Sequence, residues 1–232
     1  METSPYGLTS LWLQGDLVTR AVALLLLAMS IASWYVMIAK GLQALRFRRA
    51  LDGARRQFWT ASSLETGIAS LGDDNPFSHL AKSGARAMQH HDAHAGQLGE
   101  QLTASDWLTM SLRQAIDESA ARLSSGMAVL ASVGSTAPFV GLFGTVWGIY
   151  HALVGIGASG NVGIDAVAGP IGETLIMTAL GLAVAIPAVL GYNALVRGNK
   201  FIIARMNRFA HDLHAYFVTG ARISHNGGQH GL

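Results

Sequence analysis

The sequence predicts an all-α membrane protein with three transmembrane helices and long helical extensions on the cytoplasmic side. Two observations support this fold class. Only 13% of the 232 residues are charged while 50% are hydrophobic, whereas soluble domains carry about 25% charged residues. The uncharged residues also gather into long stretches, and the basic residues lie outside these stretches. Cysteine is absent, which excludes disulfide frameworks, thiolate metal sites and cysteine nucleophiles.

Charged residues are missing from three stretches of 19, 42 and 23 residues, which are 21–39, 123–164 and 174–196. A helix crosses the hydrocarbon core with about 20 apolar residues. The first and third stretches therefore fit one span each, and the middle stretch fits a span and a glycine-rich connector. The predicted segments are an N-terminal tail 1–17, span 18–39, a helical region 40–126, span 127–156, a loop 157–167, span 168–196, an amphipathic helix 197–223 and a disordered tail 224–232.

The basic residues predict the orientation of the spans, because Lys and Arg collect on the cytoplasmic side. All 16 basic residues except Arg20 fall within 40–126 and 197–223. These segments are therefore expected in the cytoplasm, with the N-terminus and the 157–167 loop in the periplasm. Contact with anionic lipid explains the basic clusters better than nucleic acid does. A signal peptide is a poor alternative for the first span, since its apolar stretch is too long and no basic segment precedes it.

The cytoplasmic region is predicted to contain helices at 42–66 and 77–94, separated by a loop at 67–76 that is rich in turn-forming residues. A further helix from Leu102 is expected to run straight into the second span. After the third span, an apolar stripe recurs at helical spacing and needs a partner, either the helices of 42–126 or a neighbouring subunit. The stripe consists of Ile202, Met206, Phe209, Leu213 and Phe217.

Histidines cluster at His90, His91 and His94, but no carboxylate or cysteine completes a compact metal site there. A solvated polar patch is the better interpretation, and the same holds for His211 and His214. No metal or other cofactor is predicted.

Glu173 is the acidic residue of the third predicted span. A charged side chain at the bilayer centre costs about 2.5–3.5 kcal/mol or more and is by default a functional candidate. Because hydrocarbon disfavours the charged form, such a group can take up and release a proton. The alternative is hydration near the outer end of the span, since Glu173 follows Asp165 by eight residues.

Small residues in the second and third spans predict close helix packing, which in lipid depends on such residues. Thr145 and Thr178 add hydroxyl groups at depth, although each could simply bond to its own helix. Glu173 and Thr178 are about 140° apart around a helix and are not expected to face the same axis. The candidate packing positions are Gly141, Gly144, Gly148 and Gly181, with Pro138 and Pro187 as kinks that packed neighbours tolerate.

Two segments resemble the ExbB/TolQ/MotA family of proton-channel subunits, and most closely its ExbB branch. They read APFVGLFGTVWGIYHAL at 137–153 and AGPIGETLIMTALGLAVAIPAVLGYNALVR at 168–197. The first span and the region 40–126 match the family in topology and length only. The short N-terminal tail is similar to the ExbB form without an extended periplasmic leader.

The resemblance implies a homopentamer in the bacterial inner membrane, built around a lumen that holds the single transmembrane helices of an ExbD dimer. Such a complex uses the proton-motive force to energise TonB for uptake of iron siderophores, haem or vitamin B12. The resemblance implies that Glu173 is the family's membrane glutamate and that Thr145 and Thr178 are its pore threonines. The ExbD partner would supply a membrane aspartate. His151 is a further candidate for proton entry, and a polar interface residue is its alternative.

Three other functions compete with this hypothesis. A TolQ-like subunit would share the mechanism but maintain the cell envelope. A structural scaffold would use the polar membrane residues for packing only. A MotA-like flagellar stator usually has four spans and fits less well. An enzyme is not expected, because the spans contain no acid pair and no Ser/His arrangement suited to hydrolysis.

Overall fold

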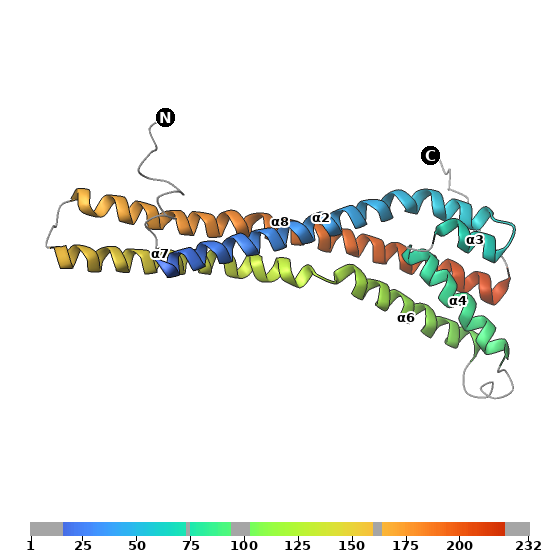
Figure 1. The fold of residues 1–232 in the computed structure, drawn as a ribbon. Helices are drawn as coiled ribbons and strands as arrows, with labels where there is room; N and C mark the ends of the chain where they lie inside the picture. Colours follow the sequence, from blue (N-terminus) through green and yellow to red (C-terminus); the bar gives the residue numbers. More distant parts are fainter. Residues whose placement is uncertain (1–15, 73–74, 94–102, 160–163, 221–232) are drawn as a thin grey trace, which may run out of the picture. The chain divides into compact units, whose positions relative to one another are not determined.

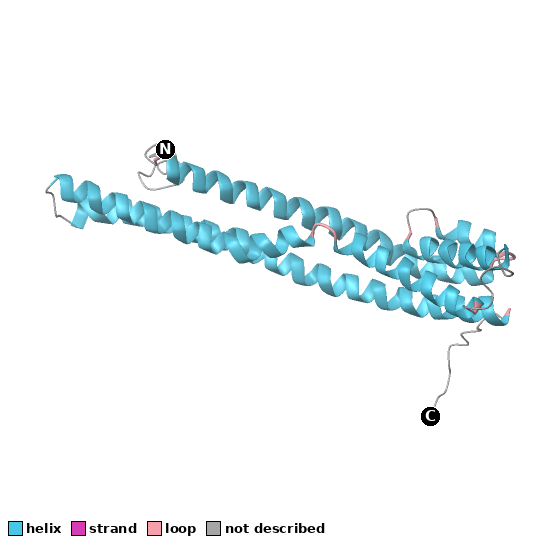
Figure 2. Ribbon diagram, turned by 90° about the horizontal axis from the view of Figure 1, so that it is seen from below, coloured by secondary structure: helices cyan, strands magenta, loops and turns pink. Residues whose placement is uncertain are grey.

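The computed structural model describes residues 16–72, 75–93, 103–159 and 164–220, with side chains for all of them except 48–56, 159, 164–170 and 173. All regular structure in these ranges is helical (Figure 2), which confirms the all-α prediction for the described part of the chain. The helices are α2 (Leu17–Thr60), α3 (Leu64–Leu71), α4 (Pro76–Ala93), α6 (Ala104–Ser124), α7 (Met127–Ser159) and α8 (Ile164–Thr219).

The chain divides into two compact units, and α2 and α8 each contribute to both. The first, here called the membrane unit, comprises Met1–Gly41 and Gly126–Leu195. The second, here called the helical unit, comprises Leu42–Ser125 and Val196–Leu232.

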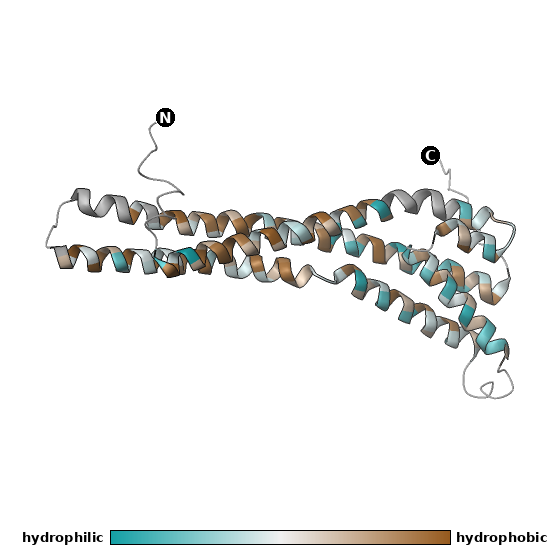
Figure 3. Ribbon diagram, in the orientation of Figure 1, coloured by the Kyte–Doolittle hydropathy of each residue, from teal (hydrophilic) through white to brown (hydrophobic). Residues whose placement is uncertain are grey.

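Three of the described helices are long and apolar enough to cross a membrane, as predicted. The candidate spans are Leu17–Phe47, Met127–Ala158 and Thr174–Thr219. Brown, apolar residues dominate α7 and the membrane-unit parts of α2 and α8, whereas teal residues are frequent in α4 and α6 (Figure 3). The chain is therefore a multi-pass membrane protein.

In the membrane unit, α2, α7 and α8 lie side by side (Figure 1). Their mutual contacts bury Leu26 on α2, Leu130 on α7 and Met177 on α8. Many large apolar side chains on the outer faces of the helices are exposed, among them Leu24, Ile31, Phe139, Val146, Ile186 and Leu190. These faces require lipid or other protein chains around them.

In the helical unit, the apolar stripe of α8 forms the centre of the core. The first four stripe residues are each at most 1% exposed, and Phe217 packs against the same core. Phe209 meets Phe58 and Phe77 edge-on, with ring centroids 5.1 and 5.4 Å apart. The expected partner of the stripe is therefore present within the same chain, in the helices between residues 42 and 126.

The expected continuous helix from Leu102 into the second span is wrong. Helix α6 ends at Ser124 and α7 begins at Met127. Gly126 between them has a φ of 78°, in the left-handed region that glycine adopts without steric cost. The Asn199 side-chain amide donates to the Leu123 carbonyl at 3.0 Å, which satisfies a carbonyl near the end of α6.

The predicted loop at 67–76 is also shorter than expected, because α3 extends to Leu71. Ser63 caps α3 by accepting a hydrogen bond from the Thr66 amide, so that Gly67 lies inside a helix. Gly67 packs directly beneath the Phe58 ring, where a Cβ would lie 3.0 Å from a ring carbon. The close approach of an aromatic ring explains this helical glycine.

Candidate functional site

In the membrane unit, Gly141 on α7 and Gly181 on α8 pack directly against each other. A Cβ added at Gly141 would lie 2.6 Å from the Met177 carbonyl oxygen and 3.0 Å from the Gly181 Cα. A Cβ at Gly181 would lie 2.7 Å from the Ala137 carbonyl oxygen. Because the obstructing atoms are backbone, side-chain movement cannot relieve either clash. The two helices meet backbone to backbone at this point.

Thr145 lies one turn along α7 from this contact and is 6% exposed. Its hydroxyl is 2.6 Å from the Thr178 hydroxyl, 3.0 Å from the Thr174 carbonyl oxygen and 3.2 Å from the Gly141 carbonyl oxygen. A single hydroxyl hydrogen serves only one acceptor at a time. The structure thus joins the two predicted pore threonines across α7 and α8, in addition to the expected bond within the helix.

The predicted packing residues Gly144 and Gly148 also lie at helix contacts. A Cβ at Gly144 would lie 3.0 Å from the Val22 side chain, and one at Gly148 would lie 2.3 Å from the Thr174 side chain. Pro138 lies inside α7 and Pro187 lies inside α8. Both prolines are half-buried, and both helices continue through them.

Thr145→Val is expected to weaken the α7–α8 contact by about 0.5–2 kcal/mol, since it keeps the shape but removes the interhelical hydrogen bonds. Unfolding of the purified protein in mixed detergent micelles measures this loss. Thr136→Val is the matched control, because Thr136 is exposed and donates only to the Ser132 carbonyl of its own helix. Equal losses in the two variants would contradict an interhelical role for Thr145.

The structure reveals a polar cluster at the end of the membrane unit where α2 begins, here called the outer cluster. It consists of Asp16, Trp147 and His151. The Trp147 indole N–H donates to Asp16 Oδ2 at 2.6 Å, and His151 Nε2 lies 3.9 Å from the same oxygen. The Trp147 and His151 ring centroids are 4.8 Å apart.

Asp16 is also the N-cap of α2, because Oδ1 accepts a hydrogen bond from the Thr19 amide at 2.8 Å. Partial burial opposes ionisation of Asp16, but hydrogen bonds from Thr19 and Trp147 and the nearby His151 outweigh it and lower the pKa of this carboxyl. A lowered pKa means that the carboxylate stabilises the fold above the ordinary pKa of aspartate, and that this stabilisation is lost as the pH falls through the lowered value.

Sequence reasoning did not assign a role to Asp16 or Trp147. An aspartate before an apolar run is a helix-start signal, so the cap was recognisable. The bond to Trp147 joins residues 131 positions apart, and no local pattern indicates it.

Glu173 is a residue of α8. Its side chain is not among the side chains that the structure describes. The following residue, Thr174, packs against Gly148 of α7. Gly148 in turn follows Trp147 of the outer cluster. The Glu173 backbone therefore lies within about one helical turn of the level of the outer cluster along the helix axes.

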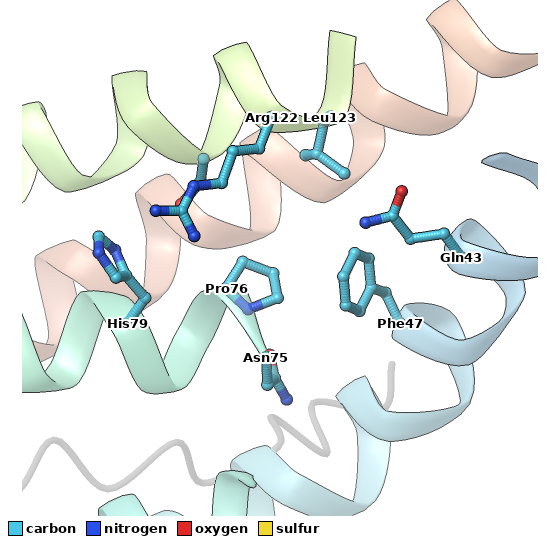
Figure 4. A pocket seen from close by; sticks show the side chains of 8 residues that line it. Gln43, Phe47, Asn75, Pro76, His79, Arg122 and Leu123 are labelled. Atoms are coloured by element: carbon cyan, nitrogen blue, oxygen red, sulfur yellow. The ribbon is translucent and has the colours of Figure 1, made fainter. Parts of the chain in front are cut away.

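The helical unit contains a cavity of about 110 Å³ between α2, α4 and α6 (Figure 4). Several polar side chains that line this cavity form hydrogen bonds with neighbouring backbone groups. Asn75 caps α4 by accepting from the Phe77 amide, and Ser119 donates to the Ala115 carbonyl. These two polar groups therefore form hydrogen bonds at the end of one helix and within another. The lining residues are Gln43, Phe47, Asn75, Pro76, His79, Ser119, Arg122 and Leu123.

Within the described ranges, no group of three or more His, Asp or Glu side chains is placed to hold a metal ion. His90 stacks on Trp107 with ring centroids 5.7 Å apart. His214 Nε2 lies 3.0 Å from the Ser105 hydroxyl. His94 is outside the described residues.

Comparisons with known proteins match a segment that contains α7 and most of α8. The MotA/TolQ/ExbB proton channel family profile matches residues 73–208. The chain is 47% identical over 216 residues to the biopolymer transport protein ExbB of Xanthomonas campestris pv. campestris, covering 90% of this chain and 85% of the relative. It is 42% identical over 202 residues to ExbB of Neisseria meningitidis, covering 86% and 92%. It is 31% identical over 222 residues to the Tol-Pal system protein TolQ of Pseudomonas aeruginosa, covering 93% and 95%.

Proposed function

Because the chain belongs to the MotA/TolQ/ExbB proton channel family, we propose that it is an ExbB-type subunit of an inner-membrane complex. This complex converts the proton-motive force into work on TonB for outer-membrane uptake of iron siderophores, haem or vitamin B12. The observation that carries the ExbB assignment is 47% identity over 90% of the chain to a relative named ExbB, against 31% to the TolQ relative.

In this proposal Glu173 takes up and releases the proton. Thr145 and Thr178 supply hydroxyl groups beside its path, and their mutual hydrogen bond at 2.6 Å keeps them at one level of the α7–α8 contact. His151 contributes to proton entry. The chain acts as a channel subunit and not as an enzyme, and its function requires no cofactor.

The proposed orientation follows the basic residues. The helical unit contains or adjoins 15 of the 16 basic residues and lies in the cytoplasm with the C-terminus. The N-terminus and the loop between α7 and α8 lie in the periplasm, so that the outer cluster faces the side from which protons enter. The basic residues of the helical unit contact anionic lipid headgroups, and nucleic acid is not a partner.

The proposed assembly is a homopentamer whose lumen holds the membrane helices of an ExbD-like dimer. Large apolar side chains on α2, α7 and α8 are exposed in the single chain. This exposure is consistent with additional chains or lipid around each subunit. The ExbD-like partner spans the membrane once and contributes an aspartate to the lumen. TonB is the further partner on which the complex acts.

The proton-motive force supplies enough free energy for the proposed function. One proton that crosses a potential of 100 mV releases about 2.3 kcal/mol. This free energy shifts the population between two arrangements of the partner helices if they differ in their preference for protonated Glu173.

Purification in mild detergent tests the assignment. The chain is expressed with its chromosomal neighbours from the source organism and captured by a C-terminal tag. We expect a small one-span protein with a membrane aspartate to co-purify in a fixed ratio. Recovery of the chain alone, under conditions that retain bound lipid, would contradict the proposed complex.

The TolQ-type alternative predicts a different phenotype. A strain without this gene would be sensitive to detergent and normal in iron uptake under that alternative. Under the present proposal the same strain fails to grow on a ferric siderophore as its sole iron source and keeps an intact envelope.

A further inference from the structure

The outer cluster joins two helices through one carboxylate whose oxygens have different partners. Oδ1 of Asp16 caps α2 through Thr19, and Oδ2 faces α7, where it accepts from Trp147 at 2.6 Å and lies 3.9 Å from His151 Nε2. Trp147 thus holds the carboxylate beside the imidazole. The start of α2 lies beside α7 in the fold (Figure 1).

The charged part of this cluster is exposed at the surface of the chain. The side chains of Asp16 and His151 are 35% and 50% exposed, whereas Thr145, six residues earlier on α7, is 6% exposed. Six residues correspond to about 9 Å along a helix. The exposed groups and the buried Thr145 therefore lie at successive depths of the same unit.

Asp16 lies just before the first candidate span, which begins at Leu17, whereas Trp147 and His151 lie towards the end of the candidate span Met127–Ala158. The uncharged stretch of α2 starts at Ala21, and Asp16 precedes it by five residues, or about 7 Å along the helix. A stretch of 19 residues spans about 28 Å, close to the thickness of the hydrocarbon core. Asp16 is consequently expected near the headgroup level, within about one helical turn of the level of the Glu173 backbone.

We infer that Asp16 and His151 form a proton-collecting site at the entrance to the pathway, with Trp147 as the residue that positions them. This inference rests on the proposed function and adds the entry site to it. Histidine is the side-chain type that changes charge between pH 5 and 8, and a carboxylate beside it attracts the incoming proton.

The proton balance of the site is simple. A proton from the periplasmic water binds the neutral imidazole of His151, and the Asp16 carboxylate balances the resulting charge. Release of that proton towards the pathway through water restores the neutral ring, so no other reactant is consumed. Among the described side chains, the other ionisable groups nearby are Arg20, one turn after Asp16 on α2, and Tyr150, whose ring centroid is 5.6 Å from that of His151.

A purely structural clasp between α2 and α7 is the competing interpretation. It makes a different prediction about pH. A collecting site matters most when protons are scarce, so that its loss is compensated by a more acidic medium. Loss of a clasp weakens the complex to a similar degree at every pH of the medium.

The experiment measures initial uptake of a radiolabelled ferric siderophore at outer pH 6, 7 and 8. The host is a bacterial strain without its own ExbB-type and TolQ-type genes that carries this chain with the one-span and TonB-like proteins of the source organism. The variants are Asp16→Asn, His151→Asn, their double mutant and Trp147→Phe. Membrane levels of each variant and its co-purification with the one-span protein are measured in parallel.

We expect Asp16→Asn and His151→Asn each to lower uptake about two- to fivefold at outer pH 8, the range that an exposed charge pair supplies, with recovery at pH 6. The double mutant is expected to match the single mutants, because both residues act as one site. Trp147→Phe keeps both ionisable groups but removes the hydrogen bond that holds Asp16 beside His151, and we expect a smaller deficit at pH 8 than that of Asp16→Asn, again with recovery at pH 6.

Two outcomes overturn the inference. One is a deficit of Asp16→Asn that is the same at all three pH values and is shared by Trp147→Phe, which identifies a structural clasp. The other is wild-type uptake of His151→Asn at pH 8. Glu173→Gln separates these outcomes from failure of the proposed function. If that variant transports normally, the proposed function fails. If Glu173→Gln abolishes transport and the other variants show flat pH profiles, only the collecting site is refuted.

Discussion

Replacing Glu173 with glutamine is expected to reduce siderophore uptake to the level of a strain without the gene. Glutamine has nearly the same size but cannot exchange a proton at any physiological pH. Transport that depends on proton exchange inside the membrane is therefore lost, while the packing of α8 is retained. The measurement is growth on a ferric siderophore as sole iron source, combined with the yield of the co-purified complex.

The matched control for this variant is Asp165→Asn, which neutralises another carboxylate of α8 outside the 174–196 uncharged stretch. We expect Asp165→Asn to support growth. Normal growth of Glu173→Gln would identify the chain as a scaffold or place the proton path elsewhere. Loss of growth together with loss of the assembled complex would assign Glu173 a role in assembly instead.

Substitution of Gly181 is expected to have the largest effect on folding. The Cβ of Gly181→Ala would overlap the Ala137 carbonyl oxygen at 2.7 Å and approach the Gly141 Cα at 3.1 Å. Since both obstacles are backbone atoms, α7 and α8 must separate, at an expected cost of about 1–3 kcal/mol. Gly181→Val adds two methyl groups at the same point, and we expect it to prevent recovery of a monodisperse complex.

Thermal unfolding and size-exclusion chromatography of the purified protein measure these losses. Gly155→Ala is the control, because Gly155 is a helical glycine of α7 with no atom within 4 Å of its added Cβ. Alanine is favoured over glycine within a helix by up to about 1 kcal/mol, so this variant is expected to be neutral or slightly stabilised. A Gly181→Ala protein as stable as Gly155→Ala would disprove the backbone contact.

Local sequence patterns predicted those features of the fold that depend on a regular pattern of residues within one helix. The three spans follow from missing charge, and the α8 stripe follows from apolar residues at helical spacing. The break before α7 was not predicted, because Gly126 is compatible with a helix interior and only its φ of 78° reveals the turn. A single glycine at the membrane boundary is ambiguous in sequence, whereas five apolar residues in register are not.

The candidate site was predicted less completely for a related reason. Thr145 and Thr178 were predicted as separate hydroxyl-bearing positions, to which the family resemblance added a pore role. Their hydrogen bond across 33 residues depends on the register of α7 against α8. That register is fixed by the backbone contact of Gly141 and Gly181, which a short glycine motif does not specify. The pairing of Asp16 with Trp147 depends in addition on where α2 begins against α7.

Two of the three junctions between the compact units, one within α8 and one at the turn before α7, differ in how they tolerate changes in chain length. Helix α8 is continuous from Ile164 to Thr219, and one residue inserted near Val196 would turn everything after it by about 100°. The buried stripe would then face away from its partners. The turn at Ser125 and Gly126 has no helical phase to preserve. Length variation among natural sequences, and engineered insertions such as epitope tags, should therefore be accepted at this turn and rejected within α8.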